Sequence, residues 1–153
     1  MGFTMVELVV VMVLVGVLAA VALPRMGAAL SARDDAWRDG LLDAMRYAQK
    51  SAVSHRRLVC ATVSNTQVTL QIATANPATS CDANYVALSG SSNVFASSSN
   101  ASMTTAVVPT GVIYFQPDGR STTDGAGNTT ANRTVTPSGL TAISIIGETG
   151  HAD

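Results

Sequence analysis

The hydrophobic and polar positions divide the chain into three stretches with different patterns. From residue 3 to residue 23 the sequence reads FTMVELVVVMVLVGVLAAVAL, an apolar run whose one charged side chain is Glu7. A helix needs about 20 apolar residues to cross the roughly 30 Å hydrocarbon core of a bilayer. The pattern therefore predicts a transmembrane helix, and Pro24 directly after the run predicts a kink or break in it.

The second stretch is amphipathic. Its apolar positions follow one another at steps of 7, 4, 3, 4 and 4, which is the spacing of one helix face: Leu30, Trp37, Leu41, Ala44, Ala48 and Ala52. Charged residues occupy the other faces, with Asp34 and Arg38 four positions apart in the supportive order. We expect the helix to continue to about Ser54 and to pack against a globular body. A helix of that length spans roughly 78 Å, so its outer half projects into water.

In the third stretch, short runs of β-forming residues are separated by Pro, Gly, Asn and Asp. Residues 57–63 and 66–72, joined by Ser64 and Asn65, predict a hairpin. Five further runs predict strands at 85–88, 106–108, 112–115, 133–136 and 140–147. Ala, Ser, Thr and Asn dominate 74–105 and polar residues dominate 121–132, so we expect long surface loops there. Antiparallel sheets packed on the outer half of one long helix make an α+β fold.

Charge follows the same division. Only 12% of the residues are charged, against about 25% in an ordinary soluble domain. Residues 25–57 carry a local excess of +3, whereas residues 58–153 carry a local net charge of −3. A general nucleic-acid binder usually places its basic residues on the folded body. The charge pattern argues against that class.

Glu7 is unusual because a carboxylate in hydrocarbon costs roughly 2.5 to 3.5 kcal/mol and is usually paired. One interpretation is that Glu7 lies near the helix end and reaches the membrane interface. The other is that a positive charge pairs with it. A cut after Gly2 would create an α-amino group on Phe3, one helical turn from Glu7, and an equivalent pairing between neighbouring subunits would fix their stagger.

The start of the chain resembles a known family. Gly2, Phe3, Thr4 and Glu7, followed by the apolar run with Gly16 inside it and Pro24 at its end, resemble the processing site and N-terminal helix of type IV pilins and type II secretion pseudopilins. The resemblance implies that prepilin peptidase cuts after Gly2, that Phe3 becomes the N-methylated terminus, and that Glu7 is the assembly carboxylate. It also implies a pilin-like fold.

The resemblance further implies an organisation and a location. Its segments are a leader remnant (1–2), a transmembrane and assembly helix (3–24), the amphipathic outer half of the helix (25–56) and a β-rich periplasmic head (57–153), with 25–153 as the soluble domain. We expect one pass through the bacterial inner membrane, a head in the periplasm, and other pilin or pseudopilin subunits, major and minor, as partners.

The body resembles the GspH/FimT-type branch of minor pseudopilins and minor pilins. The similar segments are Phe115 to Arg120 (FQPDGR), Glu148 to Gly150 (ETG) and Arg46 to Lys50 (RYAQK) with Arg56 and Arg57 after it. The resemblance implies a minor structural subunit of a type II secretion pseudopilus or a type IV pilus. The sequence does not decide between those two machines.

Two alternatives remain at this point. Some relatives on pili take up DNA through a Gly-Arg-x-Arg motif, and a DNA-binding minor pilin of an uptake pilus is the first alternative. The nearest match here, Gly119 to Thr122, lacks the second arginine, so Arg120 is a weak candidate contact and we expect little or no DNA binding. A major pilin is the second alternative, disfavoured only by the body resemblance.

Other chemistry is sparse. In an exported domain Cys60 and Cys81 predict a disulfide, with two free thiols as the alternative. His55 and His151 have no nucleophile partner nearby in sequence, and no G-x-S-x-G, HExxH or phosphate-loop motif occurs. Residues 124–128 lack the alternating acidic ligands of a calcium loop. We expect a protein that is not an enzyme and holds no metal or cofactor.

Overall fold

The computed structural model describes residues 4–81 and 92–153, and their side chains except those of 22–30. Residues divide into two compact units, Met1–Arg33 and Asp34–Asp153. Helix α1 runs from Met5 to His55, so its first part belongs to the first unit and its second part to the other. The helix continues through Pro24. The kink expected at Pro24 stays a prediction.

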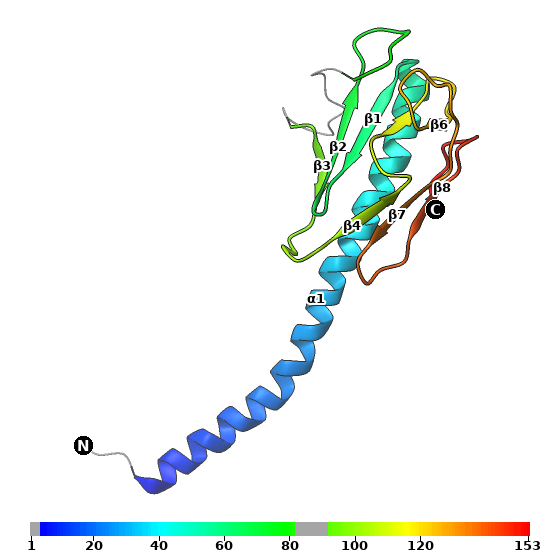
Figure 1. Cartoon of the computed structure of the whole chain (residues 1–153). Coiled ribbons are helices and arrows are strands. Elements are labelled where there is room, and N and C mark those ends of the chain that lie inside the picture. Colours follow the sequence, from blue (N-terminus) through cyan, green and yellow to red (C-terminus); the bar gives the residue numbers. More distant parts are fainter. Residues whose placement is uncertain (1–3, 82–91) are drawn as a thin grey trace. The chain divides into compact units, whose positions relative to one another are not determined.

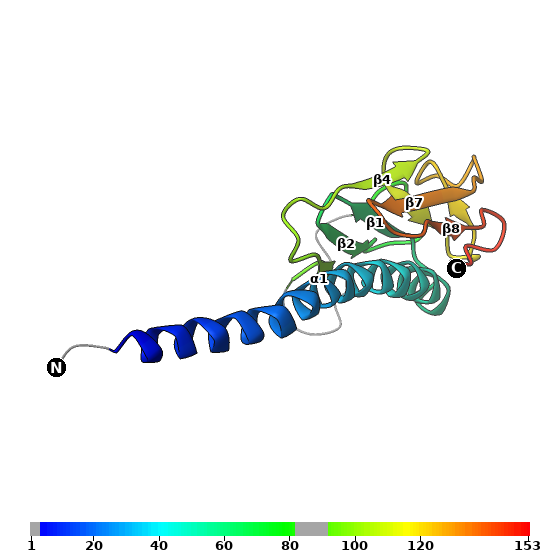
Figure 2. The same ribbon diagram turned by 90° about the horizontal axis from the view of Figure 1, so that it is seen from below.

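In the part of the chain that the structure describes, the second unit contains eight strands in two antiparallel sheets. The larger sheet has the order β3-β2-β1-β5-β6 and the smaller has the order β4-β7-β8. Both sheets lie over residues 34–55 of α1 (Figures 1 and 2). The strands are β1 (Val59–Val63), β2 (Gln67–Ile72), β3 (Val94–Ser97), β4 (Thr105–Val108), β5 (Ile113–Phe115), β6 (Ser121–Thr122), β7 (Arg133–Pro137) and β8 (Ile143–Ile145). The expected α+β architecture, a long helix packed on antiparallel sheets, is confirmed.

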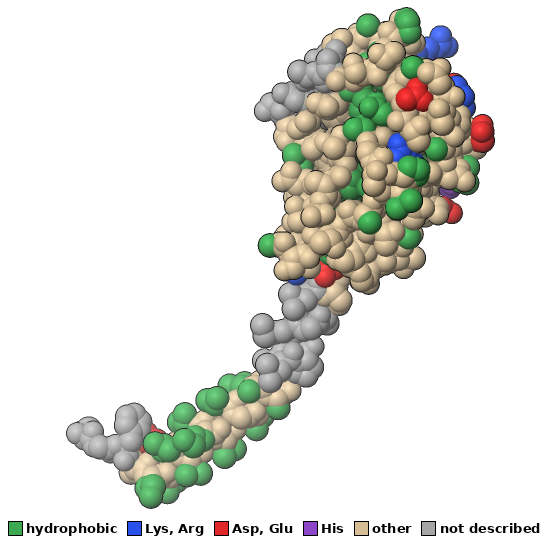
Figure 3. Space-filling model, in the orientation of Figure 1, with side chains coloured by type: hydrophobic (Ala, Val, Ile, Leu, Met, Phe, Trp, Pro, Cys, Tyr) green, Lys and Arg blue, Asp and Glu red, His purple; other side chains and the backbone are tan. Residues whose placement is uncertain are grey.

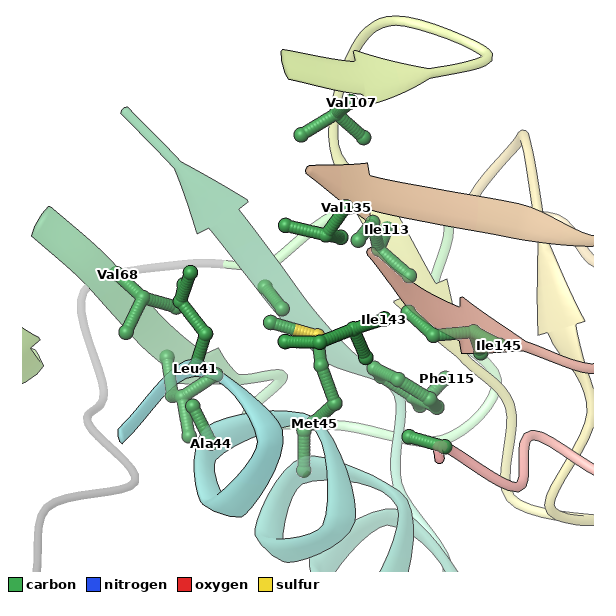
Figure 4. Close-up of a cluster of buried hydrophobic side chains, with 14 of the residues drawn as sticks. Leu41, Ala44, Met45, Val68, Val107, Ile113, Phe115, Val135, Ile143 and Ile145 are labelled. Carbon is green, nitrogen blue, oxygen red and sulfur yellow. The ribbon is translucent and has the colours of Figure 1, made fainter. Parts of the chain in front are cut away.

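The predicted helix face is the one that enters the core. Trp37, Leu41, Ala44, Ala48 and Ala52 are all buried, and Met45 joins them. Alanine at 44, 48 and 52 keeps that stripe narrow, so the sheets can approach the helix closely. Alternate residues of both sheets complete the core; Val68, Val107, Ile113, Phe115, Val135, Ile143 and Ile145 meet Leu41 and Met45 there (Figure 4).

The predicted hairpin is confirmed: β1 pairs antiparallel with β2, with Val63 opposite Val68. The turn is closed by Ser64, whose N–H donates to the carbonyl of Gln67 at 2.8 Å. Strands were also expected near β4, β5, β7 and β8, and each is present, although β8 is shorter than the run 140–147 because a turn occupies residues 138–140. The strand predicted at 85–88 lies outside the described residues.

Two expected loops contain strands, and both predictions were wrong on this point. β3 lies within 74–105 and pairs with β2, although Ser and Asn surround it. β6 lies within 121–132, and its two residues are fully buried. β3 is formed by pairing with β2, about 30 residues earlier at Gln67 and Ser97, whereas β6 pairs with the nearby β5. A local count of hydrophobic residues detects neither pairing.

Candidate assembly site

The start of α1 is capped by its own side chains. Thr4 precedes the first helical residue, and its hydroxyl oxygen accepts a hydrogen bond from the backbone N–H of Glu7 at 3.3 Å. The carbonyl of Thr4 accepts the first helical bond, from Leu8, also at 3.3 Å. Thr4 and Glu7 therefore occupy the two positions of a Thr-x-x-Glu capping box. This motif was not predicted, although Thr4-Met5-Val6-Glu7 contains it.

Glu7 consequently has two compatible roles. A carboxylate in the first turn of a helix is favoured by the helix dipole, independent of any partner. Its side chain is exposed, so it is also free to meet a positive charge from another chain. Gly2 and Phe3, the expected processing residues, lie outside the described residues, and their roles stay predictions.

Apart from Glu7, the surface of residues 5–21 in the first unit is almost entirely apolar. Thirteen large hydrophobic side chains between Met5 and Val21 are exposed, from 50% at Val10 to 86% at Met5. Figure 3 shows hydrophobic side chains covering the visible face of this segment. A helix that is hydrophobic all round is stable in water only when something covers it, whether lipid or protein. Within the residues that the structure describes, no helix has both the length and the hydropathy to cross a bilayer.

Gly16 interrupts this surface. A Cβ built on Gly16 would meet nothing within 4 Å, so no contact in this chain requires glycine there. Glycine costs about 1 kcal/mol relative to alanine inside a helix. Ala20 lies four residues later on the same face, and such small-xxx-small pairs allow two helix backbones to approach closely. The pair marks the side of the segment best suited to another helix.

In the second unit, the three segments that carried the body resemblance meet at one place. The side-chain amide of Gln49 donates to the carbonyl of Thr149. Gly150 follows with φ +63°, and a Cβ there would lie 2.2 Å from the carbonyl oxygen of Gly119. Only glycine fits so close to another backbone. Through these residues the helix, the 116–120 turn and the segment after β8 contact one another.

Arg120 is engaged within that turn. Its Nε lies 2.7 Å from Oδ2 of Asp118, and its Nη1 donates to the hydroxyl of Thr130 at 3.2 Å. Partial burial alone would raise the pKa of the Asp118 carboxyl, but hydrogen bonds from the backbone and guanidinium of Arg120 outweigh it, and the pKa falls below its usual range. A DNA phosphate would have to compete with this ion pair. The expectation of little or no DNA binding stays a prediction.

Two further features hold the body together. The predicted disulfide is confirmed, since Cys60 and Cys81 are bonded at 1.96 Å across a separation of 21 residues. A loop of that size contributes about 3 kcal/mol in the chain-entropy model.

Arg133 is the second feature, and the sequence did not single it out. It is 1% exposed, and its guanidinium donates to the carbonyls of Pro109, Val112 and Thr122. Desolvation lowers the pKa of Arg133. The side chain reaches from β7 to the other sheet and fastens the two sheets to each other.

The Asp124 carboxylate is hydrogen-bonded by the backbone of its own loop. The carboxylate of Asp124 accepts hydrogen bonds from the backbone N–H of Asn128 at 3.1 Å and of Thr129 at 2.9 Å. These bonds, chiefly the one from Asn128, lower the pKa of Asp124. Among the described residues, no three His, Cys, Asp or Glu side chains come together as metal ligands would.

No protein-family model matches the chain, and no curated protein does. Among solved structures, the chain is similar to the crystal structure of the Pseudomonas aeruginosa type IV minor pilin FimU, with a TM-score of 0.49 and 14% identity over 78% of this chain and 87% of that chain. Similarity at that level assigns no function.

Proposed function

We propose that the chain is a structural subunit of a filament built from pilin-like subunits, specifically a minor subunit of a type II secretion pseudopilus or a type IV pilus. The observation that carries the proposal is the uncovered apolar helix of the first unit, which starts at the Thr4 cap and has Glu7 as its one acidic residue. The chain acts by assembly and catalyses no reaction.

The apolar segment has two successive environments in this account. Before assembly, residues 3–24 lie in the inner membrane and the body lies in the periplasm, an oxidising compartment in which the Cys60–Cys81 disulfide persists. In the filament, helices of neighbouring subunits replace the lipid around residues 5–21. The open space over Gly16 supports such close packing.

Glu7 provides the directing contact. Prepilin peptidase cuts after Gly2, and the methylated amino group of Phe3 on one subunit pairs with Glu7 of its neighbour. Inside a helix bundle this pair is far stronger than at a surface, because few water molecules compete for either charge. A subunit out of register would leave both charges unpaired, so the pair sets the stagger between subunits.

Sheared filaments from a bacterial host that expresses the chain test the proposal. We expect the chain in the filament fraction, with an N-terminal peptide that begins at methylated Phe3 by mass spectrometry. A Gly2→Leu variant, which blocks cleavage, should remain in the inner membrane at unchanged abundance. Recovery of uncleaved Gly2→Leu chains in filaments at the unsubstituted level would refute the proposal.

A further inference from the structure

A cleft of about 290 Å³ lies between β1 of the larger sheet and β4 of the smaller sheet. Thr62 and Val63 of β1 form one wall, Thr105 and Val107 of β4 form the other, and residues 110–112 complete the lining. Among the described residues that line the cleft, none is charged. The cleft therefore suits an uncharged ligand, and it lacks the cations that hold a nucleic-acid strand.

The β1 wall of the cleft presents backbone groups without a strand partner. β5 pairs with β1 only as far as Ala61, which lies opposite Ile113. On the other side of β1, the N–H of Ser64 donates to the carbonyl of Gln67 at 2.8 Å. Because the direction of hydrogen bonding alternates along a strand, Val63 points its N–H and C=O away from β2 and into the cleft.

The β4 wall presents the same kind of groups. The N–H of Thr105 donates to the side chain of Asn65, just after β1, at 3.4 Å. Val107 lies two residues further along β4, so its N–H and C=O point the same way, toward β1. Its side chain points into the core (Figure 4), so the backbone is what it offers to a ligand. Within residues 4–81 and 92–153, no group hydrogen-bonds the backbone of Val63 or Val107.

Both ends of the cleft are held in place. At one end, the hydroxyl of Thr105 donates to the carbonyl of Asn65 at 2.9 Å. At the other end, the buried guanidinium of Arg133 donates to two carbonyls of the 109–112 turn. Gly111 in this turn has φ +110°, and a Cβ there would meet nothing within 4 Å, so the space beside it is open. The two walls are therefore preorganised, which lowers the cost of binding.

The opposite edge of the smaller sheet is covered. Ser144 of β8 and Asp153 exchange backbone hydrogen bonds of 2.9 and 3.1 Å, so residues 151–153 cover the outer edge of β8. The edge strand β4 has no such cover and carries no charged residue from 104 to 108. Charge usually protects an unpaired strand edge from pairing with another chain. An edge without it is suited to receive an extended segment.

We propose that an extended, uncharged segment of a different protein binds in this cleft, with one residue paired to the backbone of Val107 and the next residue paired to that of Val63. Neighbouring residues of an extended chain direct their backbone groups to opposite sides, so two residues bridge both walls. Valine and threonine suit these positions, because the walls are lined by the same side chains. The inference goes beyond the proposed function, since it gives the body a partner that the apolar helix does not contact.

A peptide titration tests the cleft directly. The probe is a capped hexapeptide with a central threonine–valine pair flanked by glycine and serine, added to the ¹⁵N-labelled full-length chain in detergent micelles. We expect the amide resonances of Val63 and Val107 to shift, to saturate below about 1 mM peptide, and to exchange with solvent at least about tenfold more slowly. No shift of these two amides overturns the inference.

A matched peptide separates backbone pairing from apolar contact. Ester bonds replace the two central amides, which removes their N–H donors and leaves the side chains and the protein unchanged. This peptide should bind at least about tenfold more weakly, because each pairing loses its donated hydrogen bond. Equal binding of the two peptides overturns the inference.

Substitutions test the same cleft from the protein side. Thr110→Trp places a large side chain at the cleft and should weaken binding of the amide peptide at least about tenfold. Thr141→Trp alters another exposed threonine, which does not line the cleft, and should leave binding unchanged. Equal affinities of the two variants overturn the inference.

Two other occupants would give different results. Shifts of the Val63 and Val107 amides that follow the concentration of the chain alone would assign the cleft to a second copy. The same shifts on addition of a single-stranded oligonucleotide at low salt would assign it to nucleic acid. Either result overturns the inference.

Discussion

The two parts of α1 show how one helix can serve two purposes. Residues 34–55 bury one stripe, in which Leu41 is fully buried, and leave charged residues on the other faces. In residues 5–21 the large hydrophobic side chains are at least half exposed; Leu14, for example, is 57% exposed. The first pattern is completed within the chain, whereas the second is completed only by lipid or by other chains.

In this helix, exposure distinguishes the two roles more clearly than hydrophobicity does. Both parts contain leucine, valine and alanine, yet only the buried stripe of residues 34–55 contributes to the stability of the body. Apolar residues that the chain leaves uncovered are retained for a contact outside it. The same substitution should therefore have different effects in the two parts.

Leu41→Ala and Leu14→Ala are a matched pair of substitutions that tests whether the two parts of α1 contribute differently to the stability of the body. Leu41→Ala should lower the free energy of unfolding of the body by about 2 to 5 kcal/mol, because it opens a cavity in the core. Leu14→Ala should change it by less than about 0.5 kcal/mol. Urea unfolding in detergent, followed by the fluorescence of buried Trp37, measures both. Equal losses would show that the first unit contributes to the stability of the body.

Two arginines in the body offer a second, smaller contrast. Arg133→Met should cost about 2 kcal/mol, because three backbone carbonyls, of which that of Thr122 is buried, lose their donor. Arg120→Met should cost no more than about 0.5 kcal/mol, because its ion pair with Asp118 is half-exposed. The same urea titration compares them, and a larger loss for Arg120→Met would contradict the assignment of Arg133 as the residue that joins the sheets.

The smallest predicted effect is a pH dependence from Asp118. Its pKa is lowered in the folded chain, so its contribution to stability is present above the unfolded value of about 3.9 and is lost as the pH falls through the lower folded value. Asp118→Asn should remove this part of the acid sensitivity, less than about 0.5 kcal/mol because the pair is exposed. Unfolding at pH 7 and pH 3 measures the difference, and an unchanged pH dependence in the variant would contradict the prediction.

Much of this arrangement could be predicted from the sequence, because it depends on local periodicity. The helical spacing of Trp37, Leu41 and Ala44 identified the buried face. The two short β-rich runs in 57–72, joined by Ser64 and Asn65, identified the hairpin. β3 and Arg133 could not be predicted, because each depends on partners far away in the chain. Thr4 was within reach, since a capping box is a local motif.

The site was predicted unevenly for the same reason. Glu7 was recognised as unusual because of its apolar neighbours, and the sequence could not show that Thr4 also gives it a place in a helix cap. The ring contact between Tyr47 of α1 and Phe95 of β3 joins a helix to a strand that was not predicted. A contact between residues so far apart in the chain can be recognised only in the folded structure.

The central claim is that the charge of Glu7 directs assembly, beyond its place in the cap. Glu7→Gln separates the two roles, because glutamine is accepted at the third position of a capping box but carries no charge. The decisive measurement is the abundance of Glu7→Gln chains in sheared filaments, relative to unsubstituted chains at equal membrane expression. The account predicts at least about a tenfold loss, equivalent to about 1.4 kcal/mol. Incorporation of Glu7→Gln at the unsubstituted level would contradict it.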